Sequence, residues 1–172
     1  MNVALIGASG NIGSKIQAEL IARGHTVTAI ARNAEKLASS AKVKVVAVDA
    51  ADTAALANAL RGHDAVIGSV PFAPGKMLKE TLTLPDPIKK ILDEAAAILA
   101  RLRGEHELEW TFFSPAAEIG PGERTGKFRL GGDQLVTDAN GKSRISYDDY
   151  AIALVDELER GNHIRKRFTI AY

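Results

Sequence analysis

Short apolar runs alternate with amphipathic segments over the first 70 residues of the chain. The runs are rich in Val, Ile and Ala and end at turn-forming residues, which is typical of strands buried on both faces of a parallel sheet. We expect four such strands, at residues 3–6, 26–31, 43–48 and 65–70.

The segments between these runs have helical spacing. Ile12, Ile16 and Leu20 recur every four residues, as on one face of a helix. A short helix is expected over residues 33–39, and Asp52 is placed to cap another helix before the fourth strand. Such alternation predicts an α/β, Rossmann-like, doubly wound parallel sheet with right-handed crossovers.

The second half of the chain is less regular. We expect a long amphipathic helix over residues 88–102 and a strand over residues 110–114. A small antiparallel appendage follows, with Asn140-Gly141 as its hairpin turn, and Ser146 is placed to cap a last helix. The remaining strands are expected at residues 128–130, 134–136, 143–145 and 168–172.

Composition limits the function classes. The 172 residues predict a single domain, residues 1–172, and the net charge of +1 gives no basic field for nucleic acid or an acidic membrane surface. Cysteine is absent, which excludes disulfides, thiolate catalysis and cysteine zinc sites. No apolar run approaches the ~18 residues of a membrane span, and no signal peptide is expected before the first strand. We expect a cytoplasmic protein that binds a small molecule; its oligomeric state is left open.

The most specific chemical signal is a glycine-rich turn between the first strand and the first helix, Gly7-Ala8-Ser9-Gly10-Asn11-Ile12-Gly13. Gly7 allows a sharp turn, Gly10 lets the backbone approach a pyrophosphate, and Gly13 lets the helix pack close to the sheet. Backbone N–H groups at the start of the helix can then bind an anion. A glycine turn that binds nothing is the alternative. The predicted dinucleotide-binding residues here are Gly7, Ser9, Gly10, Asn11, Ile12 and Gly13.

The spacing G-x-x-G-x-x-G resembles the short-chain dehydrogenase/reductase superfamily, in its extended and atypical branches. Residues 31–33, 48–49 and 113–116 lie where atypical members carry related motifs. Residues 109–127 and 145–172 resemble bacterial proteins assigned as NADH-flavin reductases, in the NmrA-like NAD(P)H-binding group. The resemblance implies a reductase that transfers hydride from NAD(P)H to a flavin or a similar acceptor. A non-catalytic NADP-sensing regulator is the alternative.

Two positions bear on the cofactor. NAD enzymes usually place an acidic residue about 20 residues after the glycines, at the end of the second strand. That position is Arg32 here, which can pair with a 2′-phosphate, so NADP(H) is favoured over NAD(H), with a solvated surface arginine as the alternative. Asp49 lies where related proteins hold the adenine, and capping of a local turn is an equal alternative.

Catalytic residues are harder to identify. Short-chain dehydrogenases use a Tyr-x-x-x-Lys pair, whereas Tyr147 is followed four residues later by Ala151, and Tyr150 by Leu154. Flavin reduction suits this sequence, since water can supply the proton. We expect the nicotinamide near Val70 and Ser114, with Ser114 as the catalytic candidate or, alternatively, only a strand-ending serine. No metal site is expected.

Three further expectations concern the second half of the chain and the segment that follows residue 70. The basic run at residues 165–167 is expected to protect a sheet edge. Capping and solvation account for Asp148 and Asp149. After residue 70, the chain lacks about 30 to 40 residues that members of the resembling family carry, a helix and a strand with their connections. Either the protein has lost them or the sequence omits them, and omission is favoured because the missing strand would be central to the sheet. We therefore expect a discontinuity between Val70 and Met77.

Overall fold

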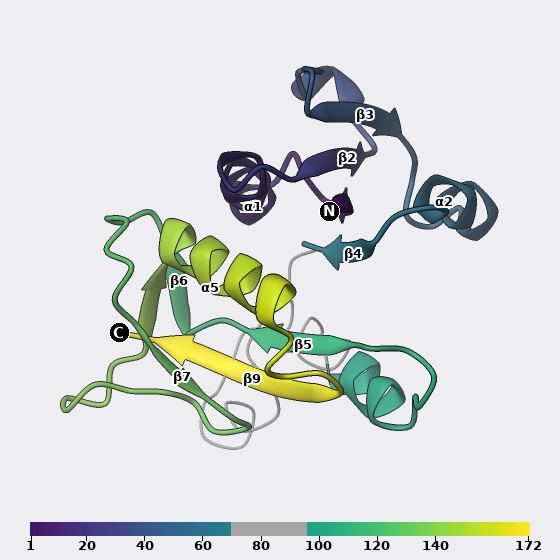
Figure 1. Ribbon diagram of the computed structural model, residues 1–172. Helices are drawn as coiled ribbons and strands as arrows, with labels where there is room; N and C mark the ends of the chain where they lie inside the picture. Colours follow the sequence, from purple (N-terminus) through teal and green to yellow (C-terminus); the bar gives the residue numbers. More distant parts are fainter. Residues whose placement is uncertain (70–95) are drawn as a thin grey trace. The chain divides into compact units, whose positions relative to one another are not determined.

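The computed structural model describes residues 1–69 and 96–172 of the chain (Figure 1). The chain divides into two units, Met1–Val70 and Pro71–Tyr172. The expectation of one domain stays a prediction. The expected discontinuity between Val70 and Met77, and the first part of the helix expected over residues 88–102, lie outside the described residues.

The first unit is built on a parallel sheet. Its four strands are paired in the order β3-β2-β1-β4, so the chain begins at the middle of the sheet and moves outward on both sides. This is the strand order of the first half of a Rossmann fold, and it confirms the predicted fold class. The strands are β1 (Asn2–Ile6), β2 (Thr26–Ala31), β3 (Val43–Ala47) and β4 (Ala65–Gly68).

Helices connect these strands near the predicted positions. In α1 (Asn11–Ala22), the predicted apolar residues Ile16 and Leu20 are fully buried, and the helix packs on β1 and β2. The segment expected as a short helix is a single 3₁₀ turn, η1 (Ala34–Lys36). Asp52 caps α2 (Thr53–Leu60) as predicted, since its carboxylate accepts a hydrogen bond from Ala55 N at 3.0 Å.

The second unit contains a three-stranded sheet in the order β5-β9-β7, with a helix over one face (Figure 1). Strands β5 (Thr111–Ser114) and β9 (Lys166–Ala171) are parallel, and β7 (Arg129–Gly131) is antiparallel to β9. The helix is α5 (Tyr147–Arg160), which Ser146 caps as predicted.

An aromatic stack joins α5 to the sheet. The ring of Phe113 lies between the rings of Tyr150 and Phe168, with centroid separations of 4.2 and 4.1 Å. A helical segment at residues 96–103 precedes β5. Within the described ranges, no helix is both long and apolar enough to cross a membrane.

The predicted antiparallel appendage is confirmed only in part, since β7 is antiparallel to β9 but the other expected strands are not antiparallel. Residues 134–136 form no strand, and the carbonyl of Gln134 accepts a hydrogen bond from the Thr169 hydroxyl at 2.8 Å. Strand β8 (Arg144–Ser146) instead pairs parallel with β6 (Glu118–Gly120). Asn140-Gly141 does lie in a turn, which the Asp138 carboxylate closes.

The basic run at residues 165–167 overlaps the start of β9. Strand β5 pairs with residues 166–169 of β9, whereas β7 pairs only with residues 169–171. The expectation that the basic run protects a sheet edge therefore stays a prediction. Of this run, Arg167 has a mostly buried side chain inside the second unit.

Candidate functional site

The glycine turn begins directly where β1 ends. Gly7 has a φ of +83°, a conformation that side chains disfavour. Its N–H donates to the carbonyl of Ile30 on β2 at 2.9 Å, and its own carbonyl accepts from the N–H of Gly10 at 3.0 Å. These two bonds fix the turn at the carboxyl edge of the sheet, where Rossmann folds bind their ligands.

Gly13 is required by the close approach of α1 to this turn. A Cβ added at Gly13 would lie 2.2 Å from the Gly7 carbonyl oxygen and 3.1 Å from the Ala8 Cα. A Cβ at Gly10 would lie 3.3 Å from the same oxygen, which is tight but allows a small adjustment. Gly13 therefore packs against the backbone of the turn itself, as well as keeping the helix close to the sheet.

The start of α1 is suited to bind an anion. Gly10 is the N-cap residue, no side chain caps this helix, and its first turn contains no acidic residue. The N–H of Ser14 is used, since it donates to the carbonyl of Gly10 at 2.9 Å. The N–H groups of Asn11, Ile12 and Gly13 precede this first helical bond, and they are the donors that a helix N-terminus offers to a ligand. Ser9 and Asn11 are both exposed beside them.

Arg32 lies at the same edge of the sheet. It directly follows β2, whose residue Ile30 is in register with Ile6 at the end of β1. The side chain of Arg32 is exposed, and it forms no hydrogen bond or ion pair with any residue in ranges 1–69 and 96–172. A guanidinium with all its donors free can bind a phosphate in two-point fashion. These residues therefore fit a dinucleotide with a 2′-phosphate.

Asp49 has a local role as well as an exposed position. One of its carboxylate oxygens accepts a hydrogen bond from Ala51 N at 3.0 Å, within the turn that leads to Asp52 and α2. The residue is nonetheless exposed, two positions beyond the end of β3. Turn capping is thus observed, and a contact with an adenine stays a prediction.

The two remaining predicted residues are not in this turn. Val70 lies outside the described residues. Ser114 is in the second unit, at the carboxyl end of β5, where it is 4% exposed. Its hydroxyl oxygen accepts a hydrogen bond from Arg167 Nε at 3.0 Å. Its role in catalysis stays a prediction.

Tyr150 is the most enclosed of the tyrosines. Its hydroxyl donates to the carbonyl of Phe113 at 3.0 Å, and burial raises the pKa of the phenol. A phenol that is buried and already hydrogen-bonded is poorly placed to exchange a proton with a substrate.

The role of Asp149 was missed by sequence reasoning. The residue was expected to be solvated, whereas it is fully buried. Its carboxylate accepts bonds from Thr125 N, Thr125 Oγ1, Gly126 N and Tyr172 Oη, at 2.6 to 2.9 Å. Burial raises the pKa of Asp149, but these hydrogen bonds outweigh it and the net shift is downward. Asp149 thus ties the loop around Thr125 and the C-terminal residue Tyr172 to the start of α5.

Several proteins are similar to this chain. YwnB of Bacillus subtilis, an uncharacterized protein, is 33% identical over 99% of this chain and 98% of its own length. A crystal structure from Burkholderia pseudomallei, of a protein assigned as exported, is 38% identical with a TM-score of 0.89, covering 100% of both chains. A protein of Streptococcus pneumoniae assigned as an NADH-flavin reductase is 31% identical with a TM-score of 0.84, covering 99% of both chains.

The alignment with YwnB extends over 211 positions, more than the 172 residues of this chain, so the relative has residues that this chain lacks. A family described as NAD(P)H-binding matches residues 7–97, a segment that starts at the first glycine of the turn. The strand order, the geometry of the turn and these similarities agree with one another. The chain belongs to the NAD(P)H-binding family and has its Rossmann-like fold.

Proposed function

We propose that this protein is an NADPH-dependent reductase that transfers hydride to a flavin. The observation that carries the proposal is Arg32, which pairs with no residue in the described ranges and lies at the edge where the glycine turn presents its N–H groups. A carboxylate at that position would repel a 2′-phosphate, whereas a guanidinium attracts one.

The residues of the first unit have separate binding roles. The N–H groups of Asn11, Ile12 and Gly13 bind the pyrophosphate, aided by the positive end of the α1 dipole. Arg32 pairs with the 2′-phosphate. NADPH, when bound, supplies the hydride. The protein holds NADPH and the flavin in the orientation that hydride transfer needs. This orientation is the main contribution of the protein, because the cofactor supplies the hydride.

The choice of a flavin as acceptor is supported by the lack of a Tyr-x-x-x-Lys pair in the sequence. Neither Tyr147 nor Tyr150 is followed four positions later by lysine. Reduction of a carbonyl needs an acid beside the oxygen, whereas a flavin takes up one hydride and one proton and can obtain that proton from water. The similarity to the Streptococcus pneumoniae protein supports the same acceptor.

The test is turnover. Purified protein is mixed with NADPH and either riboflavin or FMN without oxygen, and the loss of NADPH and of oxidised flavin is followed by absorbance. Equal, stoichiometric losses of both are expected, and none with the Gly10→Val variant. Tight NADPH binding without turnover of either flavin would reject the reductase and favour the NADP-sensing regulator.

A further inference from the structure

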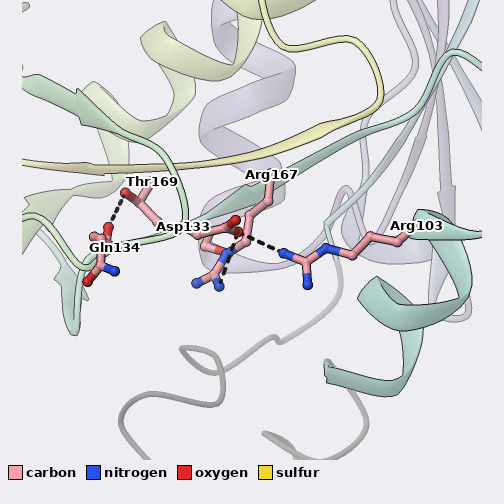
Figure 2. Close-up of polar contacts among 6 residues, drawn as sticks. Arg103, Asp133, Gln134, Arg167 and Thr169 are labelled. Carbon is pink, nitrogen blue, oxygen red and sulfur yellow. Dashed lines mark hydrogen bonds and ion pairs between the residues drawn. The ribbon is translucent and has the colours of Figure 1, made fainter.

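Two arginines converge on one aspartate on the β5-β9-β7 sheet of the second unit (Figure 2). Arg103, from the helical segment at residues 96–103, donates through Nη2 to Asp133 Oδ1 at 3.0 Å. Arg167, from β9, places its Nη1 4.0 Å from the same oxygen. We call Arg103, Asp133 and Arg167 the arginine cluster. It lies within the second unit and shares no residue with the glycine turn.

Arg167 is the unusual member of the arginine cluster. Its side chain is only 15% exposed, although a guanidinium is strongly hydrated in water. Burial lowers the pKa of Arg167; the Asp133 carboxylate opposes that shift and the neighbouring Arg103 adds to it. Of its five N–H donors, the described residues use one at hydrogen-bond distance, the Nε–H that Ser114 accepts. Its Nη1 lies 4.0 Å from Asp133 Oδ1, beyond hydrogen-bond distance.

The Asp133 carboxylate can be displaced easily from its position beside the two arginines. Its side chain is 62% exposed, it follows two glycines, and an exposed ion pair contributes little to stability. Two guanidinium charges against one carboxylate leave the cluster with one uncompensated positive charge. A phosphate monoester carries up to two negative charges and three acceptor oxygens, which matches both arginines better than Asp133 does.

We propose that Arg103 and Arg167 bind the phosphate group of the electron acceptor, and that Asp133 occupies their site until the acceptor displaces it. The inference rests on the proposed function, since it names the acceptor as a phosphorylated flavin, FMN, in preference to riboflavin. It also gives Ser114 a defined orientation. The Ser114 oxygen accepts from Arg167, and no residue in ranges 1–69 and 96–172 accepts the hydrogen of the same hydroxyl, which can donate to an acceptor atom.

The experiment compares FMN with riboflavin, because the two differ in the phosphate alone. Dissociation constants for both flavins are measured by quenching of flavin fluorescence, without NADPH, and kcat/KM is measured with it. Wild-type protein is expected to prefer FMN. Arg103→Gln should weaken FMN on the order of 10- to 100-fold and leave riboflavin unchanged. Asp133→Asn should strengthen FMN binding, because the competing carboxylate is removed.

The controls separate a specific site from general charge and from misfolding. Arg160→Gln removes an exposed arginine that pairs with Asp156 at the end of α5, and it should leave the FMN to riboflavin ratio unchanged. Arg167→Gln should act like Arg103→Gln. Should that variant fail to fold, Arg103→Gln and Asp133→Asn, which change exposed side chains, decide the question alone.

The two proposals fail in different ways. Absence of turnover with both flavins rejects the reductase, while the affinity ratios still report on the arginine cluster. Equal affinity of the wild type for FMN and riboflavin overturns the phosphate site. So does a loss of FMN binding that Arg160→Gln reproduces, or an Asp133→Asn variant that binds FMN more weakly.

Discussion

The carbonyl oxygen of Gly7 lies 2.2 Å from the position that a Cβ on Gly13 would take. No real Cβ tolerates that distance to a backbone atom, and a carbonyl that is part of a tight turn cannot rotate away. Gly13→Ala should therefore push α1 off the turn and destabilise the fold by about 1–3 kcal/mol or more. Thermal unfolding should show Tm lowered by ~2–4 °C per kcal/mol for a chain of this length.

Gly10→Ala is the matched control, since its added methyl would meet the same oxygen at 3.3 Å and needs only a small adjustment. It should unfold close to the wild-type temperature. Equal Tm values for the Gly10→Ala and Gly13→Ala variants would show that the turn yields more easily than its geometry indicates.

Gly10→Val should separate binding from folding. Gly10 has φ −78° and ψ 166°, an extended conformation that valine adopts readily, so the backbone does not need glycine there. The branched side chain would instead occupy the space through which a pyrophosphate approaches the α1 N–H groups. We expect cofactor binding to be lost in calorimetry while Tm changes little. Unaltered NADPH affinity would remove the glycine turn from the binding site.

Arg32→Asp should change the choice of cofactor. A charge-assisted hydrogen bond contributes about 1.5–3 kcal/mol, so loss of Arg32 should weaken NADPH on the order of 10- to 100-fold, and the new carboxylate adds repulsion. NADH lacks the 2′-phosphate and should respond little. The measured quantity is the Kd for NADH divided by the Kd for NADPH. In the wild type, added salt should reduce this ratio, because salt screens the attraction between Arg32 and the 2′-phosphate.

Arg61→Asp serves as the control for that experiment, because Arg61 is also exposed but lies after α2. It should leave the Kd ratio unchanged. A parallel shift of NADPH and NADH in the Arg32→Asp variant would mean that Arg32 is an ordinary surface residue.

Asp149→Asn should destabilise the second unit in a pH-dependent way. Both carboxylate oxygens of Asp149 accept bonds from donors, so the amide NH₂ of asparagine would face donors on either side. At neutral pH we expect a loss of at least ~1 kcal/mol in the free energy of unfolding.

The sign of the pH dependence follows from the lowered pKa of Asp149. A group with a lowered pKa in the folded state stabilises the fold above its unfolded pKa, about 3.9 for aspartate. That stabilisation is lost as the pH falls through the folded value. The difference between wild type and Asp149→Asn should therefore be constant near neutrality and shrink below about pH 4. Glu118→Gln, which changes an exposed side chain, should show no such trend. A difference that grows as the pH falls would contradict the assignment.

Sequence patterns located the first unit well because their signals are local. The spacing of Ile16 and Leu20, the capping residue Asp52 and the glycine turn each act within a few residues, and the structure contains all three as expected. The family and its fold follow from the same local signals. The pairing of the strand after Asn140-Gly141 was mispredicted for the converse reason: these two residues specify a turn, but a turn does not choose which strands pair.

What the sequence by itself determined is the order of strands and helices in the first unit and the glycine turn at its edge. Only the tertiary structure decided what Asp149 and Arg167 do. Asp149 meets donors 23 and 24 positions away, and Arg167 meets Ser114 across 53 positions. Such contacts exist only in the folded chain, because tertiary structure, and not local propensity, brings together residues that are so far apart in the sequence.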